Sequence, residues 1–250
     1  MSLISVIIPY YQKKKYITSS INSVLKQSYK NLELIIIYDD TNHKDLIILN
    51  NLKKKDKRIK IFINKKNIGA GLSRNKGIKL SRGKFIAFLD SDDLWSRNKL
   101  KKQIFFMKQH KIKISHTSYY IINYKNKVIG QRKAKDLSHK QLLKSCDIGL
   151  STIILDKKLI KNNIKFASIK TKEDYVLWLQ ITLNEKKIYA LPDNLTKWRK
   201  LDNSLSSSKF QKFKDGYLVY RKYMKFNQIK SFFYLCLLSI NFLLKQINIK

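Results

Sequence analysis

The chain has 250 residues, of which 44% are hydrophobic and 12% aromatic, so it can bury a substantial globular core. Its 53 lysines and arginines against 17 acidic residues give a formal net charge of +36, which attracts polyanions such as nucleic acid or anionic lipid. With 7 glycines, 2 prolines and 2 distant cysteines, the sequence excludes a long flexible linker and indicates neither a disulfide framework nor a zinc site.

The chain begins with a short apolar stretch. Residues 1–9 carry no basic leader and run directly into a predicted core strand, so we do not expect a signal peptide. The lysines are spread along the chain beside abundant Ile and Asn, a pattern that the codon bias of an AT-rich genome also produces. We expect a protein of the reducing cytoplasm that is drawn to acidic membrane surfaces.

The N-terminal part alternates between strand and helix signals. A first strand is predicted over residues 5–8, with Pro9 ending it, and a helix follows whose apolar residues recur at helical spacing. The next elements in chain order are a strand at 34–38, a helix at 47–52, a strand at 59–63, a helix at 72–80 and a strand at 85–89. This order predicts a mostly parallel sheet with helices on both faces.

In the second half of the chain, the regular alternation of predicted strands and helices ends. A helix is predicted at 98–109, strands at 113–124 and 127–131, a helix at 172–183 and a short strand at 195–199. The tail from 210 to 250 is predicted to be helical, and its residues 231–244 are apolar nearly all round. These 14 residues are fewer than the ~20 that span a bilayer. The tail is therefore expected either to lie at a membrane interface or to pack against protein.

Three carboxylates follow the predicted strand at 85–89 directly, in the run Asp90-Ser91-Asp92-Asp93. Open α/β sheets bind their ligands at this edge, and hard divalent cations take carboxylate and diphosphate oxygens as ligands. The run therefore predicts a metal site. The alternative is a solvated, Asp-rich turn that caps the following helix.

Two further segments follow strands at the same predicted edge. Asp39 and Asp40 end the second strand, where a carboxylate can accept hydrogen bonds from a base or ribose, and Tyr10 or Tyr11 can offer a stacking face. The loop from Asn67 to Gly77 contains glycines and runs into a helix with an arginine, so it can approach a phosphate closely. Its spacing matches neither a dinucleotide fingerprint nor a P-loop, and a purely structural turn is the alternative.

Six segments, taken in chain order, resemble those of the family 2 glycosyltransferases. They are SVIIPYY at 5–11, SVLKQSY at 23–29, LELIIIYDD at 32–40, NIGAGLSRNKG at 67–77, FIAFLDSDDLW at 85–95 and EDYVLWL at 173–179. The resemblance is nearly continuous over roughly the first 105 residues. It implies an α/β protein of GT-A fold with a mostly parallel central sheet flanked by helices, a nucleotide-sugar donor and an inverting displacement.

The resemblance also implies roles for particular residues. Asp174 is expected to be the general base, and Asp92 with Asp90 to hold Mn²⁺ or Mg²⁺, with Asp92 reaching the metal most directly. Asp39 is expected to meet the base, usually uracil. The full set of expected donor-binding residues is Pro9, Tyr11, Asp39, Asp40, Asn67, Gly69, Arg74, Asp90, Ser91 and Arg199.

Some of these residues also have a purely structural interpretation. Glu173 and Asp174 also suit an acidic first helical turn that complements the helix dipole. Arg199 and residues 204–206 resemble a loop that folds over the donor, although an arginine at a strand end is ordinary. The pattern departs from the family at 41–42, where Thr-Asn replaces Gly-Ser, and at Gln12, which replaces Asn. These departures fall at the expected nucleobase contacts and leave the metal motif intact.

The expected organisation is a glycosyltransferase domain at 1–206, with a donor half at 1–110 and an acceptor half at 111–206, and a membrane-associating tail at 207–250. The expected acceptor is lipid-linked or a saccharide, at the inner face of a bacterial membrane, without a specific nucleic-acid partner. No Gln-x-x-Arg-Trp segment is present, which argues against a processive synthase. The rivals are a nucleotidyltransferase of similar fold, a basic nucleic-acid-binding protein and an inactive relative.

Overall fold

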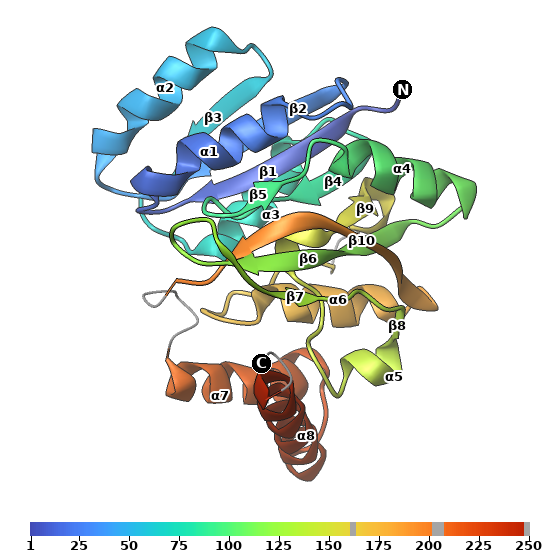
Figure 1. The fold of residues 1–250 in the computed structure, drawn as a ribbon. Helices are drawn as coiled ribbons and strands as arrows, with labels where there is room; N and C mark the ends of the chain where they lie inside the picture. Colours follow the sequence, from blue (N-terminus) through green and yellow to red (C-terminus); the bar gives the residue numbers. More distant parts are fainter. Residues whose placement is uncertain (161–163, 202–207, 248–250) are drawn as a thin grey trace.

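The computed structural model describes residues 1–160, 164–201 and 208–247. Figure 1 shows a central sheet with helices on either side. The N-terminal elements are β1 (Ile4–Tyr10), α1 (Lys14–Leu25), β2 (Leu32–Tyr38), η1 (His43–Asp45), α2 (Leu46–Lys55), β3 (Ile59–Ile63), α3 (Ala70–Leu80), β4 (Phe85–Phe88) and β5 (Leu94–Trp95). The alternation of strand and helix predicted for this part is confirmed.

The second half mixes short strands with helices. Its elements are α4 (Lys99–Gln109), β6 (Ile114–Ile122), β7 (Val128–Arg132), β8 (Leu137–Ser138), α5 (His139–Leu142), η2 (Leu150–Thr152), β9 (Ile154–Asp156), η3 (Lys157–Leu159), α6 (Glu173–Thr182), β10 (Lys187–Arg199), α7 (Lys209–Leu218), η4 (Val219–Tyr223) and α8 (Gln228–Ile247).

The sheet has the order β3-β2-β1-β4-β9-β6-β10-β5, with β7 beside β6 and β8 beside β10. Strands β1 to β4 pair in parallel, whereas β9 is antiparallel to both β4 and β6. The predicted parallel sheet is thus found in the N-terminal half, and the second half is mixed. The carboxyl ends of β1, β2 and β4 meet at one edge, where all three segments with polar residues begin.

Side chains alternate across β1 and divide the core in two. Ile4, Val6 and Ile8 point to the face covered by α1 and α4, whereas Ile7 points to the face covered by α3 and α6. Burial on both faces explains why β1 and β2 are almost continuously apolar.

Two strands differ from the sequence prediction. β1 continues through Pro9 to Tyr10, because its pairing with β4 ends at Ile7 and the missing N–H of Pro9 falls on the unpaired side. The short strand predicted at 195–199 is the end of the 13-residue β10. The strand passes Pro192 with a shift in register between Leu191 and Asn194.

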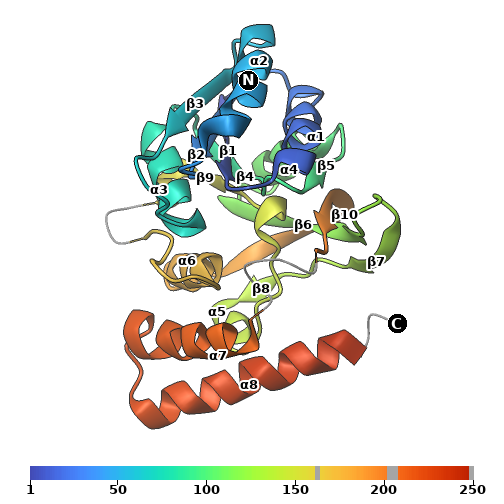
Figure 2. The same ribbon diagram turned by 90° about the vertical axis from the view of Figure 1, so that its left-hand side faces the viewer.

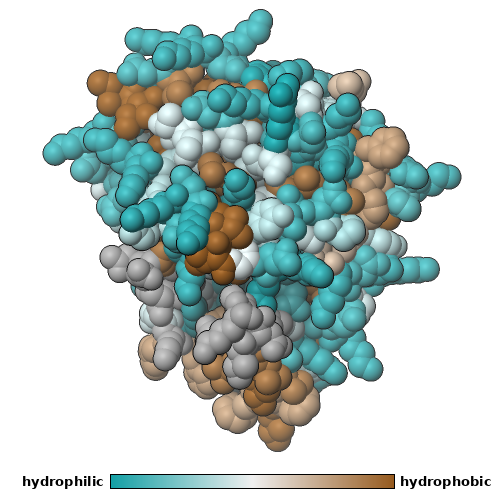
Figure 3. All heavy atoms as spheres, in the orientation of Figure 1, coloured by the Kyte–Doolittle hydropathy of each residue, from teal (hydrophilic) through white to brown (hydrophobic). Residues whose placement is uncertain are grey.

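The predicted helical tail is present and lies beneath α6, on the side away from the sheet (Figure 2). Val219, Tyr220, Leu235 and Leu238 are buried in the same core cluster as α6, so one face of the tail packs against protein. The other face is exposed, and apolar side chains gather at that end of the molecule (Figure 3). Within the described ranges, none of the helices combines the length and apolarity needed to cross a bilayer.

Candidate active site

The metal motif lies in the turn after β4. The Asp90 carboxylate forms an ion pair with Arg74 at 2.7 Å, and the Asp92 carboxylate forms one with Lys13 at 3.1 Å. Each pair uses one carboxylate oxygen. Burial and the neighbouring charge of Asp90 raise the pKa of Asp92 in spite of Lys13, so the turn carries crowded negative charge that a cation would relieve.

These carboxylates suit a cation that shares its ligands with a diphosphate. Among the residues that the structure describes, no group of three or more His, Cys, Asp or Glu side chains could hold a metal alone. Mg²⁺ and similar ions are commonly bound through one or two carboxylates together with phosphate oxygens and water. The Asp90 and Asp92 oxygens fit that type of site.

Asp93 and Arg199 fix the turn after β4 through hydrogen bonds. Asp93 is buried and accepts hydrogen bonds from the Ser151 hydroxyl at 2.6 Å and the Arg199 backbone N–H at 2.8 Å, and burial raises its pKa well above the ordinary value. The Arg199 guanidinium donates to the backbone oxygens of Asp92 at 2.8 Å and Asn123 at 3.0 Å. Arg199, expected to bind donor, is therefore buried and anchors the metal turn. Residues 204–206 lie outside the described residues.

Asp39 and the loop at 64–69 form one unit. The buried Asp39 carboxylate accepts hydrogen bonds from the Asn64 side chain at 2.8 Å and the backbone N–H groups of Ile68 at 2.9 Å and Gly69 at 2.8 Å, and Asn67 donates to the Asp39 backbone oxygen. Gly69 has φ +85°, and a Cβ built on it would meet open space. The structure thus brings three predicted donor residues together at an exposed stretch of backbone.

The two tyrosines after β1 have different surroundings. Tyr10 is fully buried, stacks on Tyr38 and donates to Asp45, so it is not available to a nucleotide. Tyr11 is 40% exposed and can offer its ring. The Asp40 carboxylate accepts from the Asn42 backbone N–H and closes the following turn.

Two other predicted residues support the same edge. Pro9 pairs in register with Ile37 of β2, one residue before the end of β1. Ser91 is buried, and its backbone oxygen accepts from the Ser20 hydroxyl of α1 at 3.0 Å. Both residues shape the backbone of the site.

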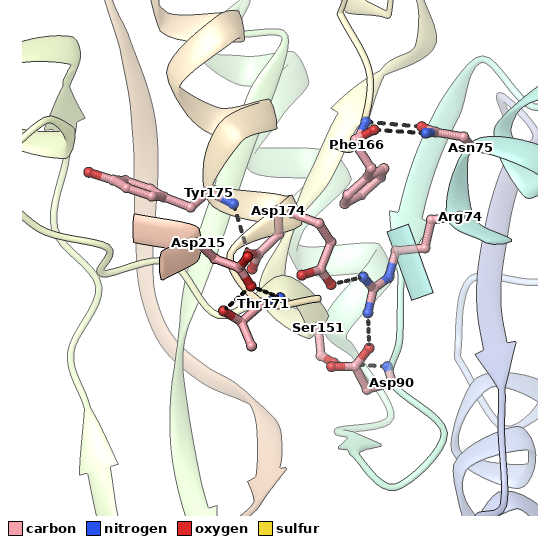
Figure 4. Close-up of polar contacts among 10 residues, drawn as sticks. Arg74, Asn75, Asp90, Ser151, Phe166, Thr171, Asp174, Tyr175 and Asp215 are labelled. Carbon is pink, nitrogen blue, oxygen red and sulfur yellow. Dashed lines mark hydrogen bonds and ion pairs between the residues drawn. The ribbon is translucent and has the colours of Figure 1, made fainter. Parts of the chain in front are cut away.

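Arg74 joins the metal turn to the helix of the predicted base. Its guanidinium is buried and donates to Glu173 at 2.6 Å and Asp90 at 2.7 Å, as Figure 4 shows for the contact with Asp90. Burial alone would lower the pKa of Arg74, but the two carboxylates hold it above its usual value. Helix α3 lies close to α6 and to the loop before it, because a Cβ at Gly71 would lie 3.0 Å from Glu173 Cγ and 2.7 Å from the Ala167 backbone oxygen. Arg74 therefore links α3 to the turn after β4 and to the first turn of α6.

Asp174 is the second residue of α6 and follows Glu173, which pairs with Arg74. Figure 4 shows Asp174 and Asp90 coming from different sides, from α6 and from the turn after β4. Asp174 is partly exposed. Burial and the charge of Glu173 raise its pKa to about 7, with Arg74 opposing the shift. A carboxylate with this pKa can accept a proton near neutral pH.

The sequence reasoning missed three contributors. Lys13 carries no motif of its own, although its place just after β1 puts it at the same edge as Asp92. Ser151, which donates to Asp93 and accepts from the Asp90 backbone N–H, carries no sequence signal. Glu173 was recognised only beside Asp174, and its pairing with Arg74 joins residues 99 positions apart. His116 of β6 is buried, and its Nε2 lies 2.9 Å from the Lys135 backbone oxygen, as in a structural histidine.

Comparisons with known proteins agree with this geometry. The family model described as "Glycosyl transferase family 2" matches residues 5–166. The Escherichia coli protein "UDP-Glc:alpha-D-GlcNAc-diphosphoundecaprenol beta-1,3-glucosyltransferase WfgD" is 39% identical over 236 residues, covering 93% of this chain and 90% of that protein.

Solved structures show the same fold. S. aureus TarS in complex with UDP-GlcNAc has a TM-score of 0.75 and 25% identity, covering 94% of this chain and 70% of that chain. The mannosyltransferase PcManGT from Pyrobaculum calidifontis, in complex with GDP-Man and Mn²⁺, has a TM-score of 0.69 and 11% identity, covering 93% of this chain and 69% of that chain. The likeness to PcManGT concerns the fold alone.

Proposed function

This chain belongs to glycosyl transferase family 2, and from that premise we propose that it transfers glucose, with inversion, from UDP-glucose to a hydroxyl of a lipid-linked saccharide. The observation that carries the proposal is the arrangement around Arg74, which places the Asp90–Asp92 turn beside the helix of Asp174. The named donor and acceptor of the Escherichia coli relative, and the UDP-sugar in the TarS complex, support the substrate classes. The matches are to glycosyltransferases rather than to nucleotidyltransferases or nucleic-acid-binding proteins.

Each part of the site has a role in this reaction. The Gly69 backbone and the exposed Tyr11 ring are placed to receive the nucleotide. Asp90 and Asp92 would hold Mn²⁺ or Mg²⁺, which when bound neutralises charge on the departing diphosphate. Mn²⁺ in the PcManGT complex supports a divalent ion of this kind.

Asp174 would act on the acceptor. Its carboxylate takes the proton of the acceptor hydroxyl as that oxygen attacks the anomeric carbon, while the bond from the anomeric carbon to the diphosphate oxygen breaks with inversion. The proton ends on Asp174 and the electron pair leaves with UDP. Arg74 keeps Glu173, the neighbour of Asp174, in place during this step.

The exposed face of the tail supports a peripheral position at an anionic membrane surface on the cytoplasmic side. Phe232, Phe233, Leu243 and Leu244 of α8 are each about half exposed or more. Exposed lysines on the same tail, Lys214, Lys222, Lys225 and Lys230, add the positive charge that anionic lipid attracts.

Release of UDP tests the proposal. Purified protein is incubated with UDP-glucose, UDP-GlcNAc or GDP-mannose and a GlcNAc-diphosphate-lipid, with Mn²⁺ or with EDTA, in vesicles of anionic or zwitterionic lipid. We expect release from UDP-glucose with Mn²⁺, loss of release with EDTA, and co-sedimentation with anionic vesicles. Release from another donor alone would overturn the assigned sugar, and equal binding to both vesicles would overturn the membrane assignment.

The pH dependence of turnover follows from Asp174. Because its pKa is raised to about 7, the carboxylate is protonated and inactive as a base at lower pH. Turnover should therefore rise about tenfold per unit up to pH ~7 and level off above it. In Glu173→Gln the neighbouring negative charge is lost, so the rising limb should move to lower pH. If the rising limb lies at the same pH in both proteins, Asp174 is not the group whose ionisation controls turnover.

A further inference from the structure

A carboxylate of the tail contacts the segment that precedes the proposed base. Asp215 of α7 is 2% exposed. One of its oxygens accepts from the Thr171 backbone N–H at 2.8 Å and the Thr171 hydroxyl at 2.9 Å, and the other accepts from the Gln211 side chain at 2.9 Å. Figure 4 shows Asp215 and Thr171 beside Asp174. Because a buried carboxylate is costly unless its oxygens are hydrogen-bonded, these three donors keep Asp215 in one position.

Thr171 stands at the point where the chain turns into α6. The next residue, Lys172, has φ 64° and lies in the left-handed region, which residues other than glycine occupy at an energetic cost. Glu173 and Asp174 then form the first turn of the helix. Such a turn persists when its flanks are fixed. The two hydrogen bonds from Thr171 to Asp215 fix the flank before it.

A second tail contact fixes the other side of Asp174. The Tyr175 ring packs edge to face against the Tyr220 ring of η4, with the ring centroids 6.5 Å apart and the hydroxyl oxygens 3.0 Å apart. Tyr175 donates to the Leu142 backbone oxygen and Tyr220 to the Leu143 backbone oxygen, so the two hydroxyls are fixed side by side. Tyr175 and Tyr220 are both fully buried. Asp174 therefore lies between two residues that the tail holds, Thr171 before it and Tyr175 directly after it.

Helix α7 packs closely against α8 and against the turn before α6. A Cβ built on Gly216, the neighbour of Asp215, would lie 2.8 Å from the Leu235 side chain of α8 and 3.6 Å from the Lys172 side chain. Helices α7 and α8 and the turn before α6 are thus in direct contact.

We propose that Asp215 is a positioning residue for Asp174, which it orients through Thr171, so that the C-terminal tail is part of the catalytic apparatus. The inference rests on the proposed role of Asp174 as the base. It differs from a purely structural role of the tail, because it assigns the effect of Asp215 to the chemical step. A base displaced by about 1 Å can lose on the order of 10²-fold in rate while substrate binding is kept.

The test compares Asp215→Ala and Thr171→Val with Thr171→Ser in the full chain. The assay measures kcat and KM with UDP-glucose, Mn²⁺ and a GlcNAc-diphosphate-lipid. In Asp215→Ala and Thr171→Val we expect kcat to fall about 10- to 100-fold, with both KM values within about twofold of the wild type. Thr171→Ser keeps the hydroxyl donor and should retain kcat within about twofold. Thr171→Val preserves the side-chain shape, so it remains informative if Asp215→Ala does not fold.

Leu238→Ala is the matched control. Leu238 is a buried residue of α8 in the same core cluster, and its truncation lowers Tm. We expect Leu238→Ala to keep the wild-type kcat per folded molecule. If it loses kcat as Asp215→Ala does, the effect of Asp215 is general destabilisation and the proposal is wrong.

Hydrogen exchange gives a readout that needs no turnover. Amides of residues 171–178 should exchange at least several-fold faster in Asp215→Ala and Thr171→Val than in Leu238→Ala of equal Tm. Wild-type kcat and wild-type exchange in both variants, together with an inactive Asp174→Asn, would overturn the positioning role alone. A fully active Asp174→Asn would instead overturn the proposed role of the base, and the inference would fall with it.

Discussion

Replacing Asp174 with asparagine is expected to lower kcat for sugar transfer by about 10³-fold. Asparagine keeps the shape of the side chain and an oxygen that can accept from the Tyr175 backbone N–H, as Asp174 does at 2.8 Å. It cannot take up the acceptor proton. Steady-state transfer from UDP-glucose to a GlcNAc-diphosphate-lipid measures the loss.

Donor binding should survive this substitution. Arg74 pairs with Glu173 and Asp90 rather than with Asp174, so the contact between the donor segment and α6 stays in place. Calorimetric titration with UDP-glucose and Mn²⁺ is expected to give a Kd within about twofold of the wild type. Asp193→Asn, which alters a carboxylate paired with Lys102 at the surface, is the control and should keep full activity. Wild-type turnover of Asp174→Asn would remove Asp174 from its role.

Replacing Arg74 with methionine is expected to lower the free energy of unfolding by about 3 kcal/mol. The guanidinium is buried between Asp90 and Glu173, and its loss leaves two acidic groups near each other without their shared cation. We expect the lower end of the range for broken buried pairs, because the Asp90 side chain is 32% exposed and water can partly solvate it. Urea unfolding of the two proteins measures the difference.

The same variant should also change the pH profile. Arg74 opposes the upward shift in the pKa of Asp174, so its removal should raise that pKa and move the rising limb of turnover to higher pH. Arg82→Met is the matched control, since the Arg82 side chain is 72% exposed and lies 3.6 Å from Glu33. It should change the free energy of unfolding by less than about 1 kcal/mol. Equal stability losses in the two variants would show that Arg74 does not hold the site together.

Much of the candidate site was open to prediction because it depends on local order. Asp39, Asp90 and Gly69 follow apolar strands or open a helix, and parallel strands bring such ends to one edge of a sheet. The donor and metal segments therefore could be grouped before any coordinate was known. The choice between Tyr10 and Tyr11 could not be made, because which side of β1 continues into the core depends on neighbouring strands.

The local sequence pattern does not identify the proposed base. The pattern Glu173-Asp174 marks a helix start in any protein, and only the resemblance to the family favoured Asp174. The raised pKa of Asp174 arises from burial and from charges on other segments, and the Arg74 contact joins α3 to α6. Likewise, the tail reads as an apolar helix, but its contacts from Asp215 and Tyr220 to the segment around Asp174 span about 45 residues of sequence.

By itself, the sequence determined the alternating N-terminal half, the edge at which its carboxylates gather, and the family. Each of these depends on periodicity and on motifs within a short stretch of chain. Only the tertiary structure decided that Arg199 anchors the metal turn, that Arg74 joins donor and base segments, and that one face of the tail belongs to the core. Hydrogen bonds and packing between segments that are distant in the sequence determine these features. The pattern of neighbouring residues therefore does not predict them.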